Sequence, residues 1–169
     1  MVKLKDWIRY CKHLCYPPWR LSRVLPPRSL DAITQAIAKS ERQHSGEIRV
    51  AVEAALDWHR LRHRQSARER ALEVFSELRV WDTEHNNGVL IYLLLADRDV
   101  EIIADRGIAR LVGQGEWEKI CQKMEAAFRQ GQFEEGILSG VTAVGEVLRR
   151  HFPGPDRAGN ELPDTPAIV

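Results

Sequence analysis

Two polar loops hold the side chains of this chain that are suited to binding a metal ion or moving a proton. The first loop carries Asp82, Asn86 and Asn87, and the second carries Asp105 followed by Arg106. Carboxylate and amide oxygens are the ligands that calcium prefers, and a carboxylate can act as a general acid or base. An Arg side chain can hold a phosphate through its planar fork of N–H donors. The candidate metal ligands are therefore Asn86, Asn87, Asp82 and Asp105, and the candidate catalytic residues are Asp105, Asp82 and Arg106.

A predicted β-hairpin brings these two loops together. Residues 89–95 are continuously apolar, which predicts a strand at the centre of a sheet, buried on both faces. The chain turns at Asp97, and residues 100–104 return as a second strand. Because antiparallel neighbours run in opposite directions, the loops at 82–87 and 105–107 should meet at one end of the hairpin.

A strand and a helix that precede the hairpin complete the predicted sheet. Residues 47–53 alternate between apolar and polar side chains, as a strand does. Ser66 and Glu69 have the spacing of a capping box, which predicts the start of a helix. Strand, helix and hairpin then form a right-handed crossover with a parallel pair of strands, and the returning strand adds an antiparallel neighbour. We therefore predict an α/β fold, a three-layer α/β/α sandwich with a central mixed β-sheet.

Three segments divide the 169 residues. Residues 1–28 are predicted to form a basic, amphipathic N-terminal segment and a Pro-rich connector. Residues 29–152 form the domain, and their last two helices follow the hairpin. Residues 153–169 lack an apolar pattern, which predicts a disordered C-terminal tail.

The N-terminal segment combines an apolar stripe with positive charge. Its apolar residues recur at spacings of three and four, which predicts a short amphipathic helix within residues 1–15. Packing of this stripe onto the domain is the favoured interpretation. The alternative is a peripheral contact of residues 3–15 with an anionic membrane, helped by Trp7 and Trp19. The stripe consists of Leu4, Trp7, Ile8, Cys11 and then Leu14 or Cys15.

The Pro pairs after this helix predict an extended connector over residues 16–28. Trp19 and Leu21 are its expected anchors on the domain. Ser29 is expected to cap the next helix, with Leu30 and later apolar residues facing the core.

Overall composition bears on the classes of partner and compartment. Lys and Arg number 25 against 24 Asp and Glu, so overall charge gives no support for a nucleic-acid partner. Three Cys without a paired framework favour free thiols in a reducing compartment, which predicts a cytoplasmic protein. No apolar run approaches the roughly 20 residues of a membrane-spanning helix. A basic run is interpreted as the solvated start of a helix; it contains Arg60, Arg62, His63, Arg64, Arg68 and Arg70.

The hairpin resembles a known family. It has Asn-Gly-Val-Leu-Ile at residues 87–91, then Asp-Arg at 97–98, a second strand, and a small loop that ends at Gly107. This pattern is similar to the TPM domain family, which includes thylakoid-lumen proteins of photosystem II repair and many bacterial relatives. The similarity runs from about residue 30 to residue 152 and takes in segments 45–50, 73–75 and 128–137. The resemblance implies the same fold, here as a soluble, stand-alone version.

The resemblance also implies a calcium site. Related TPM domains bind calcium near an Asp-Asn-Gly loop, so the matching positions here are Asn86 and Asn87. Asp82 and Asp105 are further candidates from the residues themselves. Asn86 stands where many members have Asp, which removes one formal charge, so we expect calcium to bind weakly or not measurably. The plainer interpretation is that Asn86, Asn87 and Gly88 only form a turn.

Two functions from different classes follow for the chain. Some family members are described as acid phosphatases, which would make this chain a weak, metal-assisted phosphatase acting at the hairpin-end loops through Asp105, Asp82 and Arg106. No nucleophile and base stand at a recognisable spacing, however. We therefore favour a non-catalytic binding, assembly or quality-control accessory module with an unidentified protein partner, and keep the phosphatase as the alternative.

Overall fold

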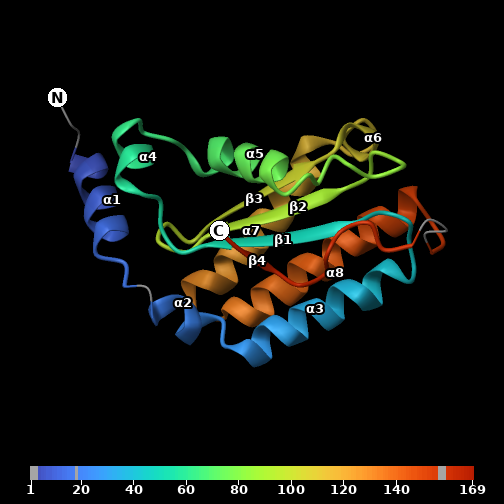
Figure 1. Cartoon of the computed structure of the whole chain (residues 1–169), viewed down its shortest axis with the longest axis horizontal. Coiled ribbons are helices and arrows are strands. Elements are labelled where there is room, and N and C mark those ends of the chain that lie inside the picture. Colours follow the sequence, from blue (N-terminus) through green and yellow to red (C-terminus); the bar gives the residue numbers. More distant parts are fainter. Residues whose placement is uncertain (1–3, 18, 156–158) are drawn as a thin grey trace.

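Four strands and eight helices make up the part of the chain that the structure describes. The structure is a computed structural model that describes residues 4–17, 19–155 and 159–169 (Figure 1). The strands are β1 (Ile48–Glu53), β2 (Val89–Leu94), β3 (Asp99–Ala104) and β4 (Ala167–Ile168). The helices are α1 (Leu4–Leu14), α2 (Trp19–Val24), α3 (Pro27–Glu41), α4 (Trp58–Arg62), α5 (Ala67–Glu77), α6 (Arg106–Ala109), α7 (Gln114–Arg129) and α8 (Phe133–His151).

The strands form one mixed sheet in the order β3-β2-β1-β4. β1 pairs with β2 in parallel, with Val50 opposite Ile91, and β2 pairs with β3 antiparallel. All six residues of β2 are buried, as a central strand requires. The predicted crossover through α5 and the predicted hairpin are both confirmed.

Helices cover both faces of this sheet, which confirms the three-layer sandwich (Figure 1). Side chains alternate along each strand, so that Val50 and Ile91 face one core while Leu90 and Tyr92 face the other. The first core is closed by α3, α7 and α8, and the second by α4 and α5. The predicted capping box is present at the start of α5, where the side chains of Ser66 and Glu69 bond each other's backbone N–H.

The segment before the domain differs from the predicted connector. Residues 19–24 form α2 because the Pro pairs lie outside this run, where Pro does not interrupt a helix. Leu21 packs against the core as expected, but Trp19 is exposed. Ser29 does not cap α3, because Pro27 begins that helix with a preset φ. Instead, the Ser29 hydroxyl donates to the carboxylate of Glu134 on α8.

The expected disordered tail is corrected for residues 159–169, which run along the outer edge of β1 (Figure 1). β4 pairs in parallel with β1, with Ala167 opposite Ala51. The Arg49 guanidinium donates to the carbonyls of Pro163 and Thr165. Backbone and charge-assisted hydrogen bonds hold this segment, so a search for apolar periodicity does not detect it.

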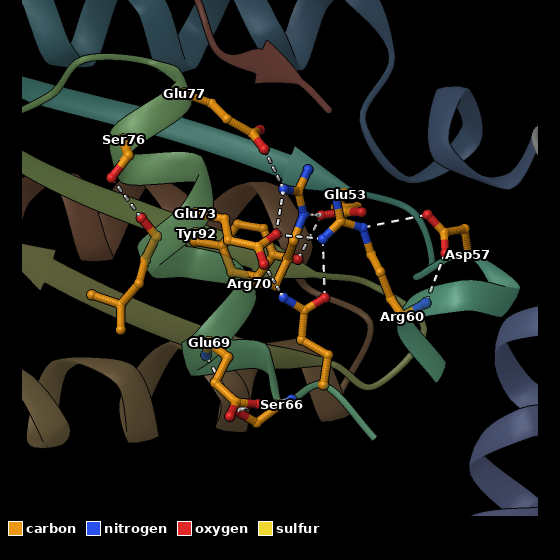
Figure 2. Close-up of polar contacts among 12 residues, drawn as sticks. Glu53, Asp57, Arg60, Ser66, Glu69, Arg70, Glu73, Ser76, Glu77 and Tyr92 are labelled. Atoms are coloured by element: carbon orange, nitrogen blue, oxygen red, sulfur yellow. Dashed lines mark hydrogen bonds and ion pairs between the residues drawn. The ribbon is translucent and has the colours of Figure 1, made fainter. Parts of the chain in front are cut away.

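A buried ion pair links the sheet to α5 (Figure 2). Arg70 Nε on α5 donates to Glu53 Oε2 at 2.8 Å, and the Tyr92 hydroxyl donates to the same oxygen at 2.8 Å. A second Arg70 nitrogen, Nη1, lies 2.9 Å from Glu77 Oε1 and 3.2 Å from Glu73 Oε2. Burial raises the pKa of the Tyr92 hydroxyl, and the neighbouring Glu53 charge raises it further. Arg70 is therefore part of the interior rather than of a solvated helix start.

Substitution of Glu53 should measure how far the sheet depends on this pair. Glu53→Ala leaves the buried Arg70 cation without its Glu53 partner, and should lower the free energy of unfolding by about 3–5 kcal/mol. Tyr92→Phe removes one hydrogen bond and should cost about 1 kcal/mol. Urea unfolding followed by circular dichroism measures both. Arg68→Ala, which removes an exposed pair with Glu101, is the control and should cost less than about 1 kcal/mol. Equal losses for Glu53→Ala and Arg68→Ala would contradict the assignment.

Glu41 on α3 should make stability depend on pH. Burial raises the pKa of its carboxyl to about 8; a hydrogen bond from the Ile48 N–H opposes the rise, and Glu47 and Asp164 add to it. Because the folded chain holds this proton after the unfolded chain has released it, stability should fall as pH rises from about 4.5 to about 8. Glu41→Gln keeps the acceptor for Ile48 and cannot ionise. Thermal unfolding at several pH values should show a flatter decline in the variant, and an identical decline in both proteins would contradict the prediction.

Candidate functional site

The two predicted loops meet at one end of the hairpin, beside α6 (Figure 1). The Asp105 N–H donates to the Gly88 carbonyl at 2.9 Å, and the Gly107 N–H donates to the Asn86 carbonyl at 2.8 Å. These bonds continue the antiparallel pairing beyond β2 and β3. The sequence therefore places the candidate loops correctly.

Glycine and asparagine allow the close approach of these loops. A Cβ at Gly107 would lie 2.4 Å from the Asn86 carbonyl oxygen, and a Cβ at Gly88 would lie 2.1 Å from the Val80 carbonyl oxygen. Asn86 has a φ of 51°, in the left-handed region that Asn tolerates better than most residues. Turn geometry thus accounts for Gly88, Gly107 and the backbone conformation of Asn86.

Two side-chain oxygens in these loops are buried without a hydrogen-bond partner. Asn87 donates through Nδ2 to the Ser45 carbonyl at 2.8 Å, and its Oδ1 is unpartnered. Asp105 accepts the Arg106 N–H at Oδ1, 2.7 Å away, and so caps α6, while its Oδ2 is unpartnered. Unsatisfied oxygens of this kind are costly and need an explanation, which makes them the part of the site best suited to a cation.

The other candidate residues are used differently. Arg106 Nε donates to Asn86 Oδ1 at 3.0 Å, so the amide oxygen expected to bind a metal is already bonded to a cation. Asp82 is exposed, and its backbone N–H donates to the Arg79 carbonyl. Among the residues that the structure describes, no hydrogen bond or ion pair joins Asp82 to Asp105.

The residues present are a poor fit to a strong calcium site. Calcium takes six to eight oxygen ligands, and its affinity rises with their charge. Asp105 supplies one buried carboxylate, Asn87 one neutral oxygen, and Arg106 an opposing positive charge. Among the residues that the structure describes, no group of three or more His, Cys, Asp or Glu side chains is placed to hold a metal.

The cysteines do not form a zinc site in the part of the chain that the structure describes. Cys11 and Cys15 are exposed and free. His13, which lies between them in sequence, is buried and accepts the Leu56 N–H at Nδ1, 2.9 Å away. Burial raises the pKa of the Cys121 thiol to about 12, and the Glu101 charge contributes, so this thiol stays protonated at neutral pH.

Sequence reasoning missed how α1 attaches to the domain. Arg9 Nε donates to Asp97 Oδ2 at 2.9 Å, and His13 Nε2 lies 3.0 Å from the same oxygen. Burial opposes it, but these two partners hold the pKa of the Asp97 carboxyl below its usual value. The helix is thus attached through its polar side, with Tyr10 packed on the core, while Trp7 and Leu14 are exposed. The sequence feature that could have indicated this attachment was Asp97, a carboxylate in the hairpin turn, together with the basic residues of α1.

Comparison with known proteins agrees with this fold. The model of the TPM domain matches residues 21–147. The solution structure of the BA42 protein from the psychrophilic bacterium Bizionia argentinensis is 32% identical, with a TM-score of 0.75 over 86% of this chain and 95% of that chain. The N-terminal domain of a protein from P. gingivalis is 22% identical, with a TM-score of 0.61 over 76% of this chain and 79% of that one. Comparison with curated proteins gives no match. The chain therefore belongs to the TPM domain family.

Proposed function

We propose that this chain is a non-catalytic binding module, an accessory to the assembly or quality control of other molecules. The proposal rests on one observation: two of the candidate catalytic side chains are occupied by hydrogen bonds to other parts of the protein. Asp105 caps α6, and Arg106 holds the Asn86 side chain. A general acid or base and a phosphate-binding Arg would have to be available to a substrate instead. The free thiols support a reducing compartment, and we place the protein in the cytoplasm on that ground.

The surface that supports a binding role lies at the opposite end of the molecule from the hairpin loops (Figure 1). Trp7 and Leu14 on α1 and Trp58 on α4 are all exposed. Contiguous exposed apolar side chains with a polar rim are typical of a binding surface. The two partners considered for it are another protein and a membrane surface contacted through residues 3–15.

A weak, metal-assisted phosphatase at the hairpin-end loops is the second candidate function. One specific observation favours it, because Asp105 Oδ2 and Asn87 Oδ1 are buried without a hydrogen-bond partner. An Asp carboxylate in such a place could serve as a ligand or as an acid. The exposure of the Asp82 side chain weighs against a two-carboxylate mechanism.

Phosphomonoester turnover separates the two functions. Wild type should release no phosphate from a generic phosphomonoester above background, with or without calcium. Asp105→Asn keeps an oxygen that can cap α6 and removes the charge, whereas Asp105→Ala also removes the cap and should cost about 0.5–2 kcal/mol of stability. Robust wild-type turnover that is abolished in Asp105→Asn, with an unchanged circular dichroism spectrum, would overturn the binding-module proposal. Asp82→Ala is the second test variant, and robust wild-type turnover that this change abolishes would overturn the proposal equally.

Calcium titration tests the charge argument. The wild type should bind calcium at best at about 10⁻⁴–10⁻³ M, the range of weak sites, because Asn86 and Asn87 add no formal charge. Asn86→Asp should tighten binding, and Asn86→Asp combined with Arg106→Gln should tighten it further by removing the opposing cation. Isothermal titration calorimetry measures all three proteins. Submicromolar affinity in the wild type would refute the prediction, and an unchanged Asn86→Asp variant would show that the ligands lie elsewhere.

A further inference from the structure

An exposed aromatic groove lies between α1 and α4. The groove has a volume of about 760 Å³. Its apolar side chains are far from buried, with Trp7 63%, Leu14 58% and Trp58 56% exposed. Large aromatic side chains rarely gather on a surface without a binding role. The groove is lined by Trp7, Tyr10, Cys11, Leu14, Trp58, Arg62 and Arg64.

The two helices that form the groove are fixed to the domain by specific contacts. The polar side of α1 is fixed to the hairpin turn through Asp97, which bonds Arg9 and contacts His13. On the groove side, the Tyr10 ring lies 5.9 Å from the Trp58 ring and joins α1 to α4. Leu61 on α4 is buried in the core under α5. The exposed Trp side chains therefore belong to helices that are already fixed to the domain. This lowers the conformational entropy that would be lost on binding.

Positive charge is concentrated around this groove. The sequence spans of α1 and α4 contain five Lys and Arg residues and one Asp, although the whole chain has 25 basic against 24 acidic residues. Arg9 and Arg60 take part in ion pairs with carboxylates of the domain. Lys12 and Arg20 are exposed and line a second hollow that shares Cys11 with the groove. Arg62 is exposed at the edge of the groove itself.

We propose that the face formed by α1 and α4 binds peripherally to an anionic phospholipid surface. Trp side chains favour the boundary between headgroups and acyl chains, because they have an apolar ring and a polar N–H. Lys and Arg beside them are attracted to anionic headgroups. A second copy of this chain is disfavoured as the occupant, since a symmetric dimer would place two basic faces together. The inference rests on the proposed binding role and names its partner.

Vesicle binding tests this assignment. The full-length chain is sedimented with phosphatidylglycerol–phosphatidylcholine vesicles and with pure phosphatidylcholine vesicles, and its Trp emission is recorded. We expect binding to the anionic vesicles alone, with a blue shift of Trp emission and a marked loss of binding at high salt. Trp7→Ala/Trp58→Ala and, separately, Lys12→Glu/Arg62→Glu should each weaken the partition at least about tenfold. Trp81→Ala is the control, since Trp81 is 48% exposed but does not line the groove.

Each other outcome overturns the inference. Failure to bind anionic vesicles excludes a lipid surface, and equal binding to both kinds of vesicle excludes the role of charge. An equal loss in Trp81→Ala, with none in the charge-reversed variant, places the contact elsewhere. A dimer that Trp7→Ala/Trp58→Ala dissociates, without vesicle binding, identifies a second copy as the occupant. The charge-reversed variant alters only exposed side chains, so its circular dichroism should match wild type. None of these results depends on phosphatase turnover, so the inference and the proposed function can fail separately.

Discussion

The buried ion pair between Arg70 and Glu53 is the constraint on which the arrangement of this domain depends. Glu53 ends β1, Tyr92 belongs to β2 and Arg70 belongs to α5, so one carboxylate fixes three elements at once. Removing one member of a buried pair leaves an uncompensated charge, and alternative positions of α5 over the sheet are therefore costly. The same network reaches α4, because Arg60 bonds Glu73 on α5. The helix that carries Trp58 is thus positioned by the centre of the fold.

The central elements could be predicted from the sequence because their information is local and periodic. The continuous apolar run of β2, the alternation of β1 and the Ser66–Glu69 capping box each indicate an element without reference to distant residues. The errors have the opposite character. Arg70 was assigned to solvent, but it is buried in an ion pair with Glu53, which lies 17 residues away in the sequence. Arg49 is bonded to backbone carbonyls more than a hundred residues later in the chain. Periodicity shows where apolar side chains lie, but not which polar groups find buried partners.

The two ends of the molecule also show that apolar patterns are predictable from the sequence whereas the partners of polar side chains are not. At the hairpin end, antiparallel pairing predicted that the loops meet, yet the contact of Arg106 with Asn86 depends on side-chain geometry that no spacing shows. At the other end, the stripe of α1 predicted packing, but Arg9 and His13 turn the opposite side of the helix to the domain. In both places, charge-assisted contacts decided the orientation. The apolar pattern identified a helix correctly and its buried side wrongly.

The C-terminal segment 159–169, which lies along β1, has a consequence for synthesis of the chain. The carbonyls that accept hydrogen bonds from Arg49 lie 114 and 116 residues after it. During synthesis, β1 therefore leaves the ribosome long before β4. Until β4 is made, the edge of β1 that pairs with it is open. Open edges invite pairing with other chains, and charged side chains on an edge strand discourage it. Arg49, which in the folded domain bonds the carbonyls of Pro163 and Thr165, places a charge of this kind on that edge.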